Sequence, residues 1–450
     1  MMQVYFNRFN RFCQQSHATI KQAGGKKYKI PSPALLLSVF SLPKLCIREL
    51  LHYLKGLMAL GGLVTLVGCS HTASVPEPTA LPEMTQTQAI QRHWQLLIGR
   101  TSDSDAVGLQ IALEKDRAFS AATEGWVTAW YLAPQDHWQD QVIWQKKFKE
   151  VITAGPVVEG SLLYVGTNKG SLYALNKTNG ALVWQVHLSS EVMALPVIVQ
   201  DRLFTRTVDG KLYALSPATG ETIWVVEQSM PKLSLRGAAP VTLKDSVLFV
   251  GWETGHVEAL SVETGERLWR QRVLTSQGRT DLERMVDLQA RLIWQQGRLV
   301  VLGYHGQLQV LNPKTGLPFW TKRISGYRTP LVTDRTIFLI TDKDIVQAYD
   351  LQSGALLWQQ KHLRHRRLSE LQAFRGQLLV SDGYGTVIRL DPLDGTLLGY
   401  FVHDEETAIV KFKADEAQQT LYIQDEEGFL TRYGVVPTVF ASSPKRVSDD

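Results

Sequence analysis

The sequence predicts an all-β fold: an eight-bladed β-propeller with four antiparallel strands per blade and a ring closed by an N-terminal strand. Three observations lead to this prediction. A short motif recurs along the chain, in which Gly and alternating apolar residues precede a tight turn, and a Trp follows the turn. The copies are spaced 38 to 51 residues apart. No 12-residue segment after position 70 combines a sustained helical period with helix caps. Self-similarity at this period indicates a repeat architecture.

The eight units differ in how well they keep the motif. Four clear copies begin at Gly170, Gly210, Gly255 and Gly306, a fifth begins at Asp344, and degraded copies begin at Gly125, Gly385 and Gly428. Successive starts are separated by 45, 40, 45, 51, 38, 41 and 43 residues.

One unit, residues 192–227, shows what each repeat must be. Two strand-length segments, 192–199 and 202–208, are followed by the alternating KLYAL, the turn SPATG and the closing ETIWVVE. The Asp-Gly and Thr-Gly steps supply residues at positive φ for tight turns. Four short strands with short turns predict an antiparallel meander. Such a sheet buries both faces only when it stacks against neighbours, and the recurring Trp is predicted to fill the space between blades.

The two ends of the repeat region predict how the ring closes. The eighth unit supplies fewer strands than a full blade, whereas residues 94–100 (WQLLIGR) precede the first unit and have the pattern of a strand. We expect this segment to complete the last blade and to remove an open sheet edge. The propeller is therefore predicted to span residues 93–436, and residues 437–450 to form a loose tail.

The front of the chain has the features of an export signal. Residues 57–68 form an apolar run of 12, too short to span a bilayer but typical of a signal peptide, and basic residues precede it. The run ends in Leu-Val-Gly-Cys, the pattern of a bacterial lipobox. We expect residues 1–68 to be a signal peptide, with a true translation start after about position 45. Cys69 would be lipidated, residues 69–92 would form a flexible tether, and Ser70 favours the outer membrane.

Charge and cysteine usage change once this leader is set apart. The whole chain carries +5, but residues 1–68 hold nine Lys and Arg against one Glu, so the remainder carries −3. This balance argues against nucleic acid as a partner. All three cysteines lie at or before Cys69, so the propeller is expected to depend on its core without a disulfide. No Gly-x-Ser-x-Gly, His-Glu-x-x-His or paired-Cys motif occurs, and we expect no catalytic, cofactor-binding or metal-binding residues.

Two linkers between units are candidates for a contact surface. Residues 228–237 follow the outer strand of one unit, residues 271–288 follow that of the next, and such linkers emerge on the same face of a propeller. The first carries Leu233, Leu235 and Arg236, and the second carries Asp287. Two apolar side chains beside an Arg would form a small patch with one charge-assisted anchor. Alternatively, Arg236 and Asp287 bond each other and only fix the linkers.

The chain resembles a known family in these elements. Repeats of the form LYALNxxTGxxxW are typical of pyrroloquinoline-quinone-type propellers. Together with the lipobox, SLRGAAPV at 234–241 and TDLERMVD at 280–287, they resemble the BamB family of outer-membrane protein assembly lipoproteins. The resemblance implies a non-enzymatic scaffold, anchored by lipid on the periplasmic face of the outer membrane. It also implies that Leu233, Leu235, Arg236 and Asp287 bind the periplasmic POTRA domains of the barrel-inserting subunit BamA.

The resemblance has further implications and one departure. It implies indirect contact with other BAM lipoproteins and a possible contact with unfolded outer-membrane proteins. The family's second linker carries Asp-x-Asp, and here Gln289 stands where the second Asp is expected. Two alternatives remain: a periplasmic propeller that binds cell-wall polymer, and a quinoprotein dehydrogenase. The basic run at 361–367 (KHLRHRR) is interpreted as a solvated linker, with a functional basic patch as its alternative.

Overall fold

A computed structural model describes residues 76–84, 90–102, 108–133, 138–235, 238–275, 279–280 and 285–435. The chain divides into two units, Met1–Ser74 and Val75–Asp450, and every described residue belongs to the second. The predicted signal peptide 1–68, Cys69, Arg236 and the tail 437–450 lie outside the described residues. In the part that is described, no helix is both long and apolar enough to cross a bilayer.

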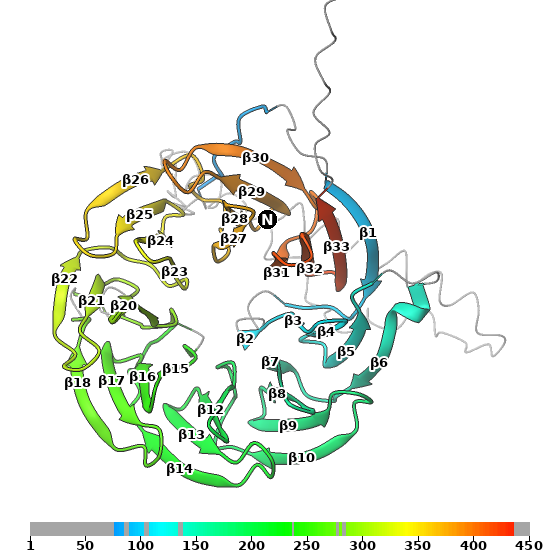
Figure 1. The fold of residues 1–450 in the computed structure, drawn as a ribbon, viewed down its shortest axis with the longest axis horizontal. Coiled ribbons are helices and arrows are strands. Elements are labelled where there is room, and N and C mark those ends of the chain that lie inside the picture. The colour runs from blue at the N-terminus through cyan, green and yellow to red at the C-terminus, as the bar shows by residue number, and fades with distance from the viewer. Residues whose placement is uncertain are drawn as a thin grey trace, which may run out of the picture. The chain divides into compact units, whose positions relative to one another are not determined.

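Eight sheets, each built on four antiparallel strands, follow one another around a central axis, as Figure 1 shows. The predicted eight-bladed propeller is therefore confirmed. Blade 1 comprises β3 (Ala112–Leu113), β4 (Arg117–Ala121), β5 (Trp126–Tyr131) and β6 (Val142–Lys147), and blade 2 comprises β7 (Ile152–Glu159), β8 (Leu162–Thr167), β9 (Ser171–Asn176) and β10 (Leu182–His187). Blade 3 comprises β11 (Val197–Val199), β12 (Arg202–Thr207), β13 (Lys211–Leu215) and β14 (Thr222–Glu227), and blade 4 comprises β15 (Thr242–Lys244), β16 (Val247–Gly251), β17 (His256–Ser261) and β18 (Arg267–Arg272).

The second half of the ring repeats this plan. Blade 5 comprises β19 (Ile293–Gln295), β20 (Arg298–Leu302), β21 (Leu308–Leu311) and β22 (Pro318–Lys322), and blade 6 comprises β23 (Leu331–Val332), β24 (Thr336–Ile340), β25 (Val346–Asp350) and β26 (Leu356–Gln360). Blade 7 comprises β27 (Gln372–Phe374), β28 (Gln377–Ser381), β29 (Thr386–Leu390) and β30 (Leu397–Val402). Blade 8 comprises β31 (Ile409–Asp415), β32 (Thr420–Asp425) and β33 (Phe429–Val435), with β1 (Ile90–Leu97) as the fourth strand. Among the described residues, the one helical element is the 3₁₀ turn η1 (Trp138–Gln141).

Ring closure occurs as the sequence predicts. Strand β1 pairs antiparallel with β33, from Ile90 opposite Val435 to Leu97 opposite Phe429, and becomes the outer strand of blade 8. The strand begins at residue 90, three residues before the predicted start of the propeller. The chain then crosses to the axis, where β2 (Gly108–Leu109) pairs parallel with β7 and adds a fifth, innermost strand to blade 2. The sequence does not predict this extra strand.

The recurring Trp joins each blade to the next through one repeated contact. In six blades its indole N–H donates a hydrogen bond of 2.9 to 3.2 Å to a backbone carbonyl in the following blade; the donors are Trp144, Trp184, Trp224, Trp269, Trp320 and Trp358. The indole ring of the Trp also covers the turn glycine of that next blade. At Gly220, where φ is 77°, a Cβ would lie 2.8 Å from the ring of Trp184. The turn glycine therefore meets two demands, positive φ and space for the indole.

Strand order decides which parts of a blade are buried. The second and third strands are nearly all buried, as in β12, whereas the fourth strand is largely exposed: in β14 only Trp224 and Val226 are partly buried. Each blade therefore contributes its inner strands to the core between blades.

Part of the predicted tether lies on the propeller. The sequence predicts residues 69–92 to be a flexible tether, but Thr79 is hydrogen-bonded to the linker between blades 6 and 7, and Leu81 packs against the core there. Figure 1 shows this segment in blue beside β30, away from β1.

Candidate partner-binding site

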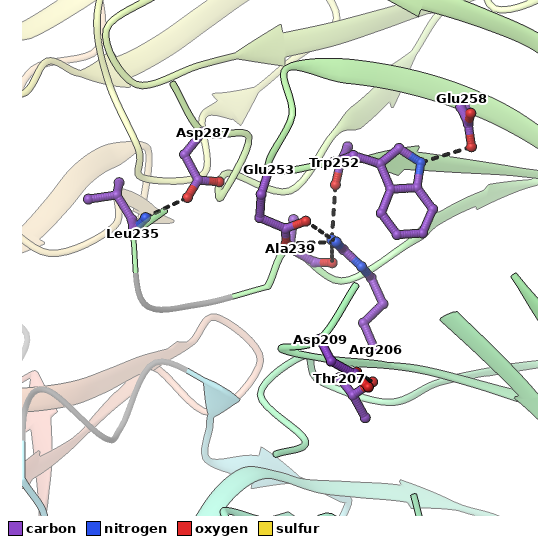
Figure 2. Close-up of polar contacts among 10 residues, drawn as sticks. Arg206, Thr207, Asp209, Leu235, Ala239, Trp252, Glu253, Glu258 and Asp287 are labelled. Carbon is purple, nitrogen blue, oxygen red and sulfur yellow. Dashed lines mark hydrogen bonds and ion pairs between the residues drawn. The ribbon is translucent and has the colours of Figure 1, made fainter. Parts of the chain in front are cut away.

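The two linkers singled out from the sequence lie next to each other. The first linker, residues 228–241, connects β14 of blade 3 to β15 of blade 4, and the second linker, residues 273–292, connects β18 to β19 of blade 5. The backbone N–H of Leu235 donates a 2.7 Å hydrogen bond to Oδ2 of Asp287, which joins them directly (Figure 2). The prediction that the two loops are neighbours is therefore confirmed.

Asp287 is almost fully buried, at 1% exposure. Its backbone is fixed to blade 5, because its carbonyl accepts a 2.9 Å hydrogen bond from the N–H of Tyr304. Among the described residues its Oδ1 has no hydrogen-bond partner. A carboxylate in this position holds the first linker by its backbone and presents no surface to a partner. Asp287 is therefore a positioning residue in this structure.

Burial also changes the acidity of this carboxyl group. Loss of solvation, and then the nearby negative charge of Glu253, raise the pKa of Asp287 to about 7, although the hydrogen bond from Leu235 and the positive charge of Arg206 act in the opposite direction. The group that connects the two linkers thus titrates near neutral pH.

A buried ion pair supports the first linker from below. The guanidinium of Arg206, on β12, donates to both carboxylate oxygens of Glu253 at 2.7 and 2.8 Å, and Arg206 is fully buried. Both bonds to Glu253 come from Nη2, and the second terminal nitrogen, Nη1, donates to the carbonyls of Ala239 at 3.2 Å and of Gly251 at 2.9 Å. The bond to Ala239 fixes the end of the first linker. Figure 2 shows both restraints on this linker, one from Arg206 and one from Asp287.

The neighbouring aromatic ring completes the support. The Cζ atom of Arg206 lies 4.6 Å from the ring centre of Trp252, within the range of a cation–π contact. The indole N–H of Trp252 donates a 2.9 Å hydrogen bond to Glu258, whose carboxylate is buried. Blades 3 and 4 are thus joined beneath the linker by a connected set of charged and aromatic groups.

The first linker presents apolar surface above this support. The side chain of Leu233 is 46% exposed, and Leu235 is half-buried. Ala238 and Ala239, further along, are buried. An exposed leucine on such a loop destabilises the free protein little, and it contributes favourable binding free energy when a partner buries it.

Gln289 occupies a different environment from Asp287. It lines a cavity of about 630 Å³ on the propeller axis, together with residues from the inner edges of blades 2 to 8. Within the described residues no group of three His, Cys, Asp or Glu side chains is arranged to hold a metal ion.

Arg206 and Glu253 are the site residues that sequence reasoning missed. A signal for Arg206 was present, because the fifth position of the second strand carries no charged residue in any other blade: it holds Ala121, Gly166, Gly251, Leu302, Ile340, Ser381 or Gln424. A charge at such a buried position requires a buried partner.

These features define an eight-bladed propeller in which one inter-blade linker is held from beneath and exposes apolar surface. The family model of outer membrane protein assembly factor BamB matches residues 123–360 and 342–398. The BamB of Escherichia coli K12 is 32% identical over 396 residues, covering 85% of this chain and 98% of that protein. The BamB of Xanthomonas campestris is 30% identical, covering 84% and 96%. The chain therefore belongs to the BamB family.

Solved structures agree with the fold. The crystal structure of BamB from Moraxella catarrhalis matches with a TM-score of 0.67 at 24% identity, covering 77% of this chain and all of that one. A quinohemoprotein alcohol dehydrogenase from Pseudomonas putida matches with a TM-score of 0.57 at 11% identity. At these identities the likeness concerns the propeller fold, which an assembly factor and an enzyme share.

Proposed function

We propose that this chain is a scaffold lipoprotein of the outer-membrane β-barrel assembly machinery. Membership of the BamB family supports a role in outer-membrane protein assembly. In this proposal the chain is lipidated at Cys69, lies on the periplasmic face of the outer membrane, and holds the periplasmic domains of the barrel-inserting subunit BamA.

The observation that carries the proposed contact is the exposed Leu233 on a linker with buried supports. Leu233 is 46% exposed, while the same linker is held at Leu235 by Asp287 and at Ala239 by Arg206. A loop restrained in this way loses little conformational freedom when a partner binds. Leu233 and Leu235 would supply the apolar contact and Arg236 a charge-assisted bond, whereas Asp287 would act through the position of the linker.

Co-purification from outer membranes tests this proposal. Leu233→Asp places a charge where apolar surface is proposed to be covered, and Arg236→Ala removes the proposed anchor. Each variant should lower recovery of BamA by about tenfold or more, because burying a leucine contributes roughly 1.5–3 kcal/mol and a hydrogen bond to a charged group contributes a similar amount. The thermal unfolding midpoint should remain nearly unchanged.

A matched control separates this contact from a general surface effect. Leu393 is 86% exposed and lies in the turn between β29 and β30, on the face of the ring opposite the linkers. Leu393→Asp should leave BamA recovery unchanged. If Arg236→Ala loses several degrees of stability and keeps its partner, the linkers only brace each other and the proposed contact is wrong.

A further inference from the structure

The segment that precedes β1 is held on the propeller far from the strand it leads to. The N–H of Thr79 donates a 3.0 Å hydrogen bond to the carbonyl of Arg364, and the carbonyl of Thr79 accepts a 2.8 Å bond from Nη1 of Arg366. Leu81 packs against the apolar cluster that contains Leu363 and Leu368. Residues 76–84, here called the strap, therefore have both polar and apolar contacts with the linker between β26 and β27.

The receiving group is itself fixed in place. Arg366 is only 8% exposed, and its Nε and Nη2 bond Oδ2 of Asp382 at 2.7 and 2.6 Å. Asp382 also accepts hydrogen bonds from the backbone N–H groups of Tyr384 and Thr386. Two guanidinium nitrogens are thus held by a buried carboxylate, which aims the third at the strap. A donor oriented in this way gives up little side-chain freedom on binding the strap.

We propose that the strap determines which edge of the propeller faces the membrane: the edge at blades 6 and 7. This inference rests on the proposed function, because it requires the lipid at Cys69. Ten residues separate Cys69 from Thr79, so a fully extended chain keeps that edge within about 36 Å of the anchor. Without the strap, the first fixed point would be Ile90 in blade 8, and the reach would be about 75 Å.

Charge alone does not account for this orientation. The linker exposes Lys361, Arg364 and Arg367, but exposed acids accompany them, namely Glu370 on the linker and Glu77 and Glu83 on the strap. With equal numbers of cations and acids, attraction to an anionic bilayer is weak. In this proposal the short length of chain between Cys69 and the strap orients the edge, so the orientation should not depend on the charge of the lipid.

The strap also sets the position of the proposed partner-binding linkers. The linker after β26 and the linker after β14 each connect an outer strand to the next inner strand, so both lie on the same face of the ring. They are separated by three blades. The strap would therefore keep the blade 6–7 edge at the bilayer and leave the surface around Leu233 further from it.

Lipid-attached quenchers measure which edge lies near the bilayer. All three cysteines of the chain lie at or before position 69, so an introduced cysteine in the propeller provides a unique label. Gln359→Cys on β26 reports on blade 6, and Gln185→Cys, at the equivalent position of β10, reports on blade 2 at the opposite side of the ring; both positions are exposed. The lipoprotein is reconstituted into vesicles of zwitterionic lipid, with and without anionic lipid, that carry nitroxide-labelled lipid.

We expect quenching at position 359 to exceed that at position 185 by about twofold or more in both kinds of vesicle. Thr79→Pro removes the N–H that bonds Arg364 and should make the two positions equal, whereas Thr79→Ala keeps both backbone bonds and should preserve the difference. Equal quenching at the two labelled positions in the protein that keeps Thr79 would overturn the inference. A difference that requires anionic lipid and survives Thr79→Pro would also overturn it.

Two parallel readouts separate this inference from the proposed function. Mass spectrometry of the reconstituted protein reports whether Cys69 is acylated, and a terminus elsewhere would refute the anchor and the strap inference together. BamA binding by the Thr79→Pro variant should remain at the wild-type level. If Cys69 is acylated, BamA binds and quenching is equal at both positions, only the strap inference fails.

Discussion

Replacing the buried Asp287 by Asn should remove a pH dependence from the stability of the propeller. The pKa of Asp287 is raised from 3.8 to about 7, chiefly by burial and then by the charge of Glu253. Between these two values the folded chain holds a proton that the unfolded chain has released. The stabilisation is therefore fully present below about pH 4 and is lost as pH rises to about 7.

The expected magnitude follows from the shift. Each pKa unit corresponds to about 1.4 kcal/mol, and about two units of this shift lie between pH 5 and pH 8, so wild type should lose about 3 kcal/mol over that interval from this group. Asn has the same shape, accepts the Leu235 N–H and does not titrate. Relative to wild type, Asp287→Asn should therefore gain stability from pH 5 to about pH 7 and level off towards pH 8.

Denaturant unfolding at pH 5, 6, 7 and 8 measures this difference. Asp394 provides the matched control, because it lies in an exposed turn where a hydrogen bond from the Thr396 side chain lowers its pKa, so it stays charged over the whole range. The free energy of unfolding of Asp394→Asn should change with pH in parallel with that of wild type. If Asp287→Asn also runs parallel, Asp287 is ionised at pH 5 and the account of its burial is wrong.

Three further predictions concern the frame and the anchor. Trp224→Ala should lower the free energy of unfolding by about 3 kcal/mol in denaturant titrations, because it empties the contact between blades 3 and 4; a loss below about 1 kcal/mol would contradict that role. Arg206→Met should cost about 3–5 kcal/mol by leaving Glu253 buried and unpaired, and adding Glu253→Met should restore most of it; equal losses in the single and double variants would show that packing alone matters. Cys69→Ala should leave the leader uncleaved and the protein without lipid, and a mature terminus elsewhere in mass spectrometry would reject the anchor.

The fold was predictable because each blade repeats the same local rules. A turn glycine and a Trp four residues later, such as Gly220 and Trp224, determine a hairpin and its contact with the next blade together. The number of copies then gives the number of blades, and the short eighth unit predicts that an N-terminal strand is needed. The inserted strand β2 was not predictable, because two residues leave no periodic pattern.

The site was predictable only in part, because the sequence shows spacing along the chain and not burial. That the linkers carrying Leu235 and Asp287 meet follows from propeller topology. That the Asp287 carboxylate faces inward and bonds a backbone N–H depends on packing against blade 5, which no local pattern contains. The strap was missed for a similar reason, since Thr79 and Arg366 are 287 residues apart.

Direct titration of the periplasmic domains of BamA against the purified chain tests the central claim, that the linker around Leu233 is a partner-binding surface. Leu233→Asp should raise the dissociation constant by about tenfold or more, the equivalent of losing at least 1.4 kcal/mol, while Leu393→Asp leaves it unchanged. If Leu233→Asp binds as tightly as wild type, the exposed linker is not the contact and the proposed function of this site is wrong.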